Sequence, residues 1–425
     1  MKKIGIGLLC ALAAAGCTAG SGIEGGLWRG GVTLAGQEIA VDLETGPEGV
    51  FFSIPGQGIL HIPVEGAVLT DEKVSFRVPL PTGELQFQGT LDEAGRIGGT
   101  FLQGGMSGEF FLEYTGSSME SAGAAAEPGS DRQVTLSRDG VKLHGMFRDL
   151  PETNDGGGWA ALIIAGSGPT DGDGNSRLLG APNNSLLRLA NVLAEEGIPS
   201  LRFDKRGAGK SVEGIGSEKD TRFTDLITDA QGWYGLLREE YPGRKYLILG
   251  HSQGSLIALD IASRAGADAV VSLAGAGFSI GTTLRAQMAA FPPEFKDTGN
   301  AILDELASGR TVDAVPPALQ ALFRPSVQPF LISYLPYDPA RIIADVDCPV
   351  LIVQGGADGQ VSPAEGENLR RARPGADYLY LPKMNHLLRD VEDDLESQRT
   401  YAEDRFPLSP GLVAGLNDFI AGISG

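Results

Sequence analysis

Residues 250–254 read Gly-His-Ser-Gln-Gly and combine a potential nucleophile with the spacing of a very tight turn. An apolar run at 246–249 precedes them and is typical of a buried strand, and the residues from 255 onward have helical spacing. The two glycines remove side chains that would collide in a sharp strand-to-helix turn. Such a turn places the hydroxyl beside the positive end of the next helix. The chemistry this predicts is attack by Ser252 on a carbonyl carbon, with the developing oxyanion stabilised nearby.

A second Gly-x-Ser-x-Gly pattern occurs at 277–281, with Ser279 at its centre. It follows the apolar run 269–273, but Ala-Gly-Ala intervenes, so that its serine lies several residues beyond the strand. Only two residues separate Ser252 from its own apolar run, which favours Ser252 as the nucleophile. The chain has 61 glycines, so a glycine-rich turn with a purely structural serine remains the alternative at either position.

A neutral serine is a poor nucleophile and needs a base, for which histidine is the usual side chain. The chain has four histidines. His61 falls in a β-rich region and His144 in a predicted hairpin, whereas His251 directly precedes the serine and should point away from its site. His386 follows the last predicted strand, at the same end of the sheet as the serine. Elimination therefore leaves His386 as the predicted base.

The third member of such a site is a carboxylate that orients the histidine and stabilises its charged form. Asp358 follows the apolar run 350–353, in a loop at the carboxyl end of that predicted strand. It also lies between the serine and the histidine in the chain, an order that one hydrolase fold uses. Asp390 is a weaker alternative, and an ordinary turn aspartate is the structural alternative for Asp358.

An oxyanion of this kind needs two backbone N–H donors. One should belong to Gln253, the residue after the nucleophile. The other should come from the loop after the strand predicted at 159–164, and we assign it to Ser167 in the sequence Ala-Gly-Ser-Gly-Pro at 165–169. Each donor in such a hole contributes ~3 kcal/mol to transition-state stabilisation.

The elements that must position these residues alternate between strands and helices over 131–425, which predicts an α/β fold with a mostly parallel sheet. The alternation fails over about 278–339, where helical runs mix with proline pairs. We expect a helical cap there, whose apolar side chains pack on the sheet domain or line a pocket. A peripheral insertion is the alternative.

The residues before 131 have a different pattern of apolar and turn-forming residues. Residues 24–116 contain short β-prone runs separated by turns and predict a small all-β domain. Residues 117–130 are small and turn-forming and predict a linker.

The first residues predict export. Residues 1–16 begin Met-Lys-Lys, continue with an apolar stretch at 4–15 and have the features of a signal peptide. The residues before Cys17 resemble a bacterial lipoprotein box, in which that cysteine is acylated. We therefore expect a lipid-anchored protein of the cell envelope. Ala14 stands where the lipoprotein pattern usually has Leu, so plain secretion to the periplasm or the medium remains an alternative.

Charge and composition exclude several partners. The net charge is −20 and no basic block occurs in the 425 residues, which argues against binding to nucleic acid or to an anionic lipid surface. The aspartate-rich stretch at 171–175 lacks the glycine and glutamate that complete a calcium loop. The turn at 204–211 lacks the spacing of a phosphate-binding loop and is interpreted as structural. We expect neither a metal ion nor an organic cofactor.

Several motifs together resemble the α/β-hydrolase superfamily over 131–425. They are the Gly-Ser-Gly-Pro-x-Asp-x-Asp stretch from 166, the turn at 204–211, the elbow at Ser252, a Gly-x-x-Asp-x-x-Val loop around Asp358 and an Asn-His pair ending at His386. Within the superfamily, the first motif resembles that of exported bacterial carboxylesterases, although Ala165 replaces their usual histidine. The β-rich region likewise resembles a domain that precedes some exported hydrolases.

This resemblance implies a carboxylesterase-type serine hydrolase that cleaves small carboxylic esters through an acyl-enzyme. A serine aminopeptidase or a thioesterase of the same fold remains an alternative. A non-catalytic envelope protein that binds through its β domain is another.

Overall fold

A computed structural model describes residues 23, 25–34, 37–46, 49–55, 59–70, 72–80, 83–103, 106–116, 130–150, 158–176, 182–289, 291–401 and 403–424. The predicted signal peptide, Cys17 and nearly all of the predicted linker lie outside these residues. The chain divides near residue 120 into two compact units, which are described separately. No helix in the described ranges combines the length and the apolar character needed to cross a membrane.

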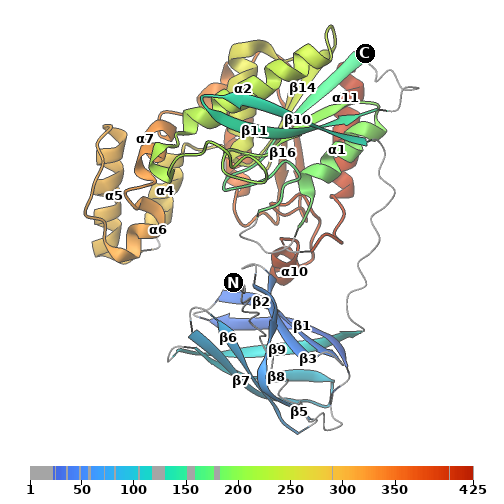
Figure 1. Ribbon diagram of the computed structural model, residues 1–425, viewed down its shortest axis with the longest axis vertical. Coiled ribbons are helices and arrows are strands. Elements are labelled where there is room, and N and C mark those ends of the chain that lie inside the picture. Colours follow the sequence, from blue (N-terminus) through green and yellow to red (C-terminus); the bar gives the residue numbers. More distant parts are fainter. Residues whose placement is uncertain are drawn as a thin grey trace, which may run out of the picture. The chain divides into compact units, whose positions relative to one another are not determined.

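The first unit is an antiparallel sheet, which in the described residues has nine strands in the order β4-β3-β2-β1-β9-β8-β7-β6-β5 (Figure 1). Its strands are β1 Gly26–Leu34, β2 Gln37–Gly46, β3 Gly49–Ile54, β4 Ile59–Pro63, β5 Glu65–Leu69, β6 Val74–Leu80, β7 Gly83–Leu91, β8 Arg96–Gln103 and β9 Met106–Gly116. The first and last strands pair with each other. The two edge strands, β4 and β5, are separated in the chain by Val64 alone, so the sheet curls back on itself.

Alternating side chains of these strands fill one core. In β6, Val74, Phe76 and Val78 are buried, as the period of two along a strand requires. Phe76 stacks on Phe87 of β7 with ring centroids 4.6 Å apart, and Phe110 of β9 meets Phe87 edge-on at 5.1 Å. This unit therefore buries a hydrophobic core of its own.

The second unit contains a mixed sheet, with eight strands in the described residues, in the order β10-β11-β13-β12-β14-β15-β16-β17. Its strands are β10 Ser130–Arg138, β11 Val141–Asp149, β12 Trp159–Ile164, β13 Ser200–Phe203, β14 Lys245–His251, β15 Ala269–Leu273, β16 Val350–Gly355 and β17 Asp377–Leu381. β11 pairs antiparallel with both β10 and β13. The remaining neighbours, from β13 through β12, β14, β15 and β16 to β17, pair parallel. The predicted fold class, a mostly parallel α/β sheet preceded by an all-β domain, is confirmed.

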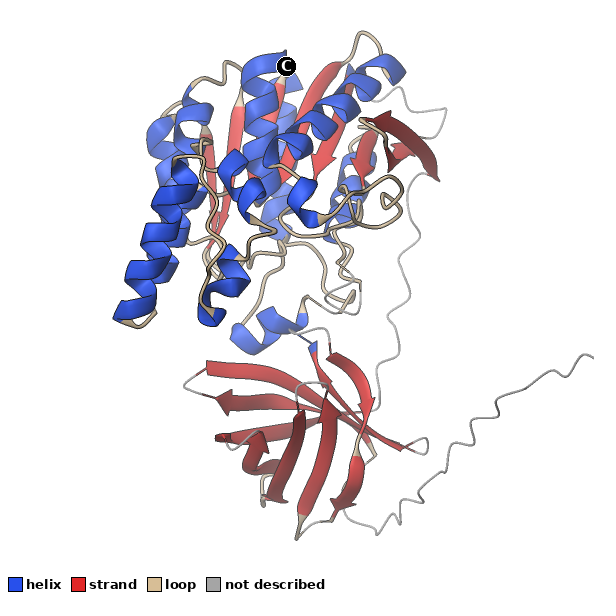
Figure 2. Ribbon diagram, turned by 60° about the vertical axis from the view of Figure 1, so that its left-hand side comes forward, coloured by secondary structure: helices blue, strands red, loops and turns tan. Residues whose placement is uncertain are grey.

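Helices cover both faces of this sheet (Figure 2). The helices outside the insertion are α1 Ser185–Glu195, α2 Phe223–Glu240, α3 Gln253–Ile261, α8 Pro339–Ala344, α9 Pro363–Ala372, α10 Asp394–Arg399 and α11 Pro410–Ser424, with a 3₁₀ helix η4 at Glu218–Asp220 and a π turn η5 at Ala262–Gly266. Alternate side chains of β12 enter two cores: Leu162 packs with α2 and α3, and Ile163 packs with α1 and α11. Because both faces are covered, the central strands are apolar throughout.

The insertion between β15 and β16 is helical and forms a small core of its own. Its helices are α4 Ile280–Met288, α5 Pro293–Ala307, η6 Pro317–Leu319, α6 Gln320–Phe323 and α7 Gln328–Tyr334. Met288, Leu319 and Phe323 are fully buried in this core. The insertion meets the sheet unit where Tyr334 stacks on Phe223 of α2, with ring centroids 4.0 Å apart. In Figure 1, α4 to α7 lie together at one side of the sheet.

Separate cores predict that the second unit folds alone. A chain that begins at Ser130 keeps every described strand of the mixed sheet and both of its cores. We expect this fragment to unfold cooperatively on heating and to show the circular dichroism of an α/β protein. A fragment that is soluble but melts without a cooperative transition would contradict this, because it would show that the β domain completes the core.

Candidate active site

The backbone at Ser252 forms a strained turn between β14 and α3. Its φ is 54° and its ψ is −120°, a region that residues other than glycine rarely occupy and that costs ~1–3 kcal/mol. A Cβ at Gly250 would lie 2.2 Å from the carbonyl oxygen of Gly254. A Cβ at Gly254 would lie 2.4 Å from the carbonyl oxygen of Ile164. Both glycines are therefore required by close backbone contacts.

The second pattern has no such geometry. Ser279 has an ordinary φ of −61° and caps α4, with its Oγ accepting a hydrogen bond from Thr282 N at 3.3 Å. Ser252 instead donates its backbone N–H to Leu273 O at 2.9 Å, which holds the turn against the end of β15. The elbow conformation thus belongs to Ser252.

His386 and Asp358 are joined by a buried hydrogen bond. The distance between His386 Nδ1 and Asp358 Oδ2 is 2.9 Å, and the two residues are 5% and 7% exposed. The other carboxylate oxygen accepts the backbone N–H groups of Gln360 and Val361, each at 2.8 Å. Since an ionised carboxylate can only accept, Nδ1 carries the hydrogen and Nε2 keeps a free lone pair. His386 can therefore accept a proton at Nε2.

Asn385 shapes the loop that carries His386. Its Oδ1 accepts the backbone N–H groups of Leu387 and Arg389, both at 3.1 Å. Its amide nitrogen donates to Thr400 Oγ1 at 2.9 Å, which ties the loop to the chain after α10. Asp390, the weaker candidate for the third member, is exposed, whereas Asp358 is the carboxylate that meets the histidine ring.

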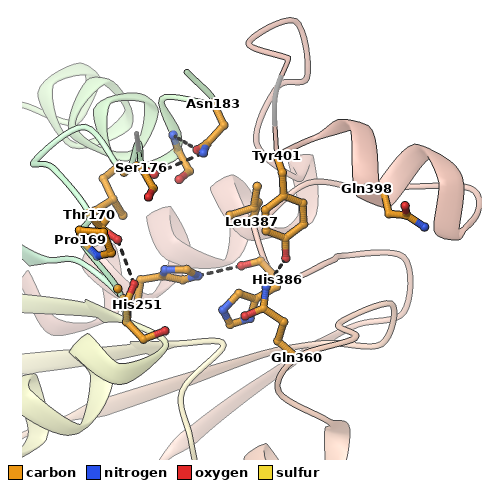
Figure 3. Close-up of a pocket in the computed structure, with 16 residues that line it drawn as sticks. Pro169, Thr170, Ser176, Asn183, His251, Gln360, His386, Leu387, Gln398 and Tyr401 are labelled. Carbon is orange, nitrogen blue, oxygen red and sulfur yellow. Dashed lines mark hydrogen bonds between the residues drawn. The ribbon is translucent and has the colours of Figure 1, made fainter. Parts of the chain in front are cut away.

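The expectation that His251 points away from the site is wrong. Its Nε2 donates to the backbone carbonyl of His386 at 2.7 Å, and the two rings lie 4.8 Å apart (Figure 3). The strained turn at Ser252 allows this, because it does not force neighbouring side chains to opposite sides as a regular strand would. Burial, followed by repulsion from His386, lowers the pKa of His251 to about 3. His251 is therefore a neutral brace for the loop of His386.

The loop after β12 lies directly against the elbow. A Cβ at Gly166 would be 3.1 Å from both Ser252 Cβ and His251 Nδ1, so only glycine fits without displacement. Within the part of the chain that the structure describes, the backbone N–H groups of Ser167 and Gln253 donate to no protein acceptor. Two predicted oxyanion donors are thus left available at the same edge of the sheet.

Sequence reasoning missed Lys205, which it assigned to a merely structural turn. The side chain is buried, and its Nζ donates to Gly166 O at 2.7 Å and to Gln253 Oε1 at 3.1 Å. Burial lowers the pKa of this lysine to about 7. The turn is fastened to the same loop region, since Asp204 Oδ1 accepts Gly172 N at 2.8 Å. A lysine two residues after a buried strand, at the edge that carries the serine, was the available signal.

Comparisons with known proteins identify hydrolases that are similar to this chain. The family described as serine aminopeptidase, S33, matches residues 183–317. Esterase EstD of Thermotoga maritima is 25% identical over 331 residues, which cover 75% of this chain and 72% of the relative. The sheet order, together with these similarities, supports an α/β-hydrolase fold for the second unit.

Solved structures of two esterases are similar to part of this chain. Esterase Pf2001 of Pyrococcus furiosus is 17% identical, with a TM-score of 0.43, over 70% of this chain and 94% of that one. Est1E from Butyrivibrio proteoclasticus is 16% identical, with a TM-score of 0.44, over 68% and 98% of the two chains.

A cavity of about 470 Å³ opens beside His386 and His251 (Figure 3). Apolar contacts come from Pro169, Leu186 and Leu387. The uncharged polar side chains around it are Ser167, Thr170, Ser176, Asn183, Ser185, Gln360, Gln398 and Tyr401. No Asp or Glu occurs among its described lining residues.

The walls of this cavity do not come from the helical insertion. Its described lining contains no residue of 278–339, whose large apolar side chains pack into the insertion's own core and against Phe223. The cavity is instead bordered by the chain that follows the histidine, in which Tyr401 accepts a hydrogen bond from Gln360. The expectation that the insertion supplies an acyl pocket finds no support in these contacts.

The buried neutral state of His251 predicts a loss of stability in acid. Between the folded pKa of about 3 and the usual unfolded value near 6.5, the unfolded chain binds a proton that the folded chain does not. The free energy of unfolding should therefore fall as pH drops, by about 2 kcal/mol from this group between pH 7 and pH 5.

Urea unfolding of the hydrolase domain at these two pH values measures this effect. A His251→Gln variant should lose about 2 kcal/mol less than the wild type on acidification. Equal losses for His251→Gln and wild type would show that His251 titrates alike in the folded and unfolded chain, which would contradict its buried neutral state.

Proposed function

We propose that this protein is a serine hydrolase that cleaves small, uncharged carboxylic esters through an acyl-enzyme intermediate. The observation that carries the proposal is the strained elbow of Ser252 together with a buried hydrogen bond between His386 and Asp358, 2.9 Å long, at the same edge of the sheet. This arrangement matches the roles of a nucleophile, a base and a residue that orients the base.

In the proposed first step, Ser252 Oγ attacks the ester carbonyl while its proton passes to His386 Nε2. The carbonyl oxygen becomes an oxyanion, which accepts hydrogen bonds from the N–H groups of Ser167 and Gln253. Asp358 stabilises the imidazolium through the hydrogen bond to Nδ1. Collapse of the tetrahedral intermediate breaks the bond to the alcohol oxygen, which takes the proton from His386 and leaves.

Water completes the cycle by the same route. It gives a proton to His386 Nε2, attacks the acyl carbon and forms a second oxyanion in the same hole. The bond to Ser252 Oγ then breaks, the serine recovers its proton from His386, and the carboxylic acid departs. Every proton transfer uses His386, and the mechanism requires only side chains and backbone groups of the chain itself.

The walls of the cavity support an ester rather than a peptide with a free amino terminus. An aminopeptidase must hold a cationic substrate amine, for which a carboxylate is the natural partner. The described lining offers amide and hydroxyl groups but no carboxylate. The relative in Thermotoga maritima is also named an esterase. A serine aminopeptidase remains the second candidate because the matching family carries that description. Thioesters could enter the same cavity.

We further propose that the protein is exported and anchored in the cell envelope by a lipid on Cys17. The sequence pattern of residues 1–16 supports this. Metabolic labelling with a palmitate analogue should mark the wild type, and a Cys17→Ser variant should remain unmarked. Labelling that persists in the variant would contradict the assignment.

The nucleophile is tested by comparing the two serines of the repeated pattern. Ser252→Ala should reduce turnover of p-nitrophenyl acetate by ~10⁶-fold, because the serine and the histidine of such a site act as a unit. Ser279→Ala should retain wild-type activity within a few fold, since this serine caps α4. Loss of activity in Ser279→Ala with Ser252→Ala unaffected would overturn the assignment, and a wild type inactive on all esters would overturn the proposed function.

Cavity size predicts a preference for short acyl chains. Each buried methylene adds ~0.8 kcal/mol until the space is filled, so kcat/KM should rise from acetyl to about butyryl or hexanoyl and then fall. A series of p-nitrophenyl esters from about two to sixteen carbons measures this. Leu186→Phe, which narrows the cavity, should move the maximum to shorter chains. A maximum at the longest chains would mean that the acyl group lies in an open groove elsewhere.

A further inference from the structure

Lys205 is a buried lysine whose cationic end lies among neutral groups. Its side chain is buried behind the elbow, and within the described residues it forms no ion pair. The carboxylate of the preceding residue, Asp204, is turned to backbone N–H groups of Gly172 and Lys210. Burying a cation without a counter-ion is unfavourable, and burial lowers the pKa of Lys205 to about 7. Such an arrangement calls for a functional reason.

The first hydrogen bond of Lys205 controls the peptide between Gly166 and Ser167. Its Nζ donates to the carbonyl oxygen of Gly166 at 2.7 Å. In a trans peptide, the carbonyl and the N–H point in opposite directions. The N–H of the same peptide belongs to Ser167, so the bond to Lys205 turns this N–H away from the buried ammonium. That N–H is one of the two proposed oxyanion donors.

The second hydrogen bond of Lys205 holds the other donor residue. Its Nζ donates to Gln253 Oε1 at 3.1 Å. Burial raises the pKa of Tyr334 to about 12, and the nearby Gln253 side chain partly offsets this rise. The side chain of Gln253 is thus fastened to Lys205 through its carbonyl oxygen, while its backbone N–H remains available at the start of α3.

We propose that Lys205 is the positioning residue of the oxyanion hole, with one buried ammonium group holding both residues whose N–H groups stabilise the transition state. The bond to Gly166 O also polarises that peptide, which strengthens its N–H as a donor. When the amine is protonated, its positive charge lies in a buried region of low dielectric, where it favours the oxyanion over the neutral carbonyl. This inference rests on the proposed function.

If Lys205 acts on the transition state, its loss has different effects on kcat, KM and folding than if it only stabilises the fold. The ground-state ester carbonyl gains little from the hole, so the loss of Lys205 should lower kcat and leave KM nearly unchanged. A merely structural lysine would instead change the folded fraction, or would alter KM together with kcat. The test therefore separates kcat, KM and the amount of folded protein.

The variant is Lys205→Met, which keeps the length of the side chain and removes its donor. The matched control is Lys210→Met in the same turn, where the side chain is exposed. Each protein is assayed with p-nitrophenyl acetate and for its rate of reaction with a fluorophosphonate probe, whose phosphoryl oxygen also occupies an oxyanion hole. We expect Lys205→Met to lose ~100-fold or more in kcat and in labelling rate, with KM within about threefold. Lys210→Met should match the wild type.

A folded Lys205→Met protein with kcat and labelling rate within about threefold of the wild type would overturn the proposal. So would a loss confined to KM. If Lys205→Met does not fold, Gln253→Met provides the test, because it keeps the backbone donor and removes one acceptor of the ammonium. We then expect kcat to fall about tenfold at constant KM, and an unchanged kcat would overturn the proposal.

The probe separates this proposal from the proposed function. A wild type that is labelled at Ser252 but hydrolyses no ester would overturn the esterase assignment, and the labelling rates would still decide the role of Lys205. A wild type that is neither labelled nor active would overturn both.

Discussion

The closeness of three backbone segments at Ser252 is the constraint on which the site depends. Gly254 lies against the end of β12, Gly250 lies against Gly254, and Gly166 lies against Ser252 itself, with no room for a further carbon at the first two contacts. This packing holds Ser252 at a positive φ, which an isolated chain would rarely adopt. The sheet on both sides of β14 supplies the rigidity that maintains the strain. One turn thereby sets the position of the hydroxyl, of the helix that follows it and of the loop after β12.

The partners of Ser252 reach it through hydrogen bonds between loops rather than through the sheet. Asp358 is oriented by two backbone N–H groups and in turn orients His386. His251 braces the carbonyl of His386, and Asn385 fixes the loop on either side of it. Since a loop has less inherent rigidity than a strand, these side chains give the histidine a defined orientation before any substrate binds.

Much of this fold follows from local sequence patterns. The helix predicted at 223–241 is α2, and the strand predicted at 159–164 is β12, because long periodic segments and short apolar runs report their own conformation. The pairing of Asp358 with His386 was expected from their positions after successive strands, since the carboxyl ends of parallel strands share one edge.

Other features depend on contacts between distant residues and were therefore missed. The ring of His251 meets the loop of His386, which is 135 residues away in the chain. Lys205 was assigned to a structural turn because nothing local indicates that its ammonium reaches Gly166 and Gln253. The insertion at 278–339 was expected to pack on the sheet domain and to line the pocket; it packs on the sheet unit through Tyr334, and its other apolar residues form a core of their own.

The central claim is that Ser252 and two backbone N–H groups form one catalytic unit. A crystal structure of the protein after reaction with diethyl p-nitrophenyl phosphate tests this directly, because the adduct imitates the tetrahedral intermediate. The account predicts phosphorus bonded to Ser252 Oγ and its phosphoryl oxygen ~3 Å from the backbone nitrogens of both Ser167 and Gln253. An adduct on another residue, or a phosphoryl oxygen directed away from these two nitrogens, would contradict it.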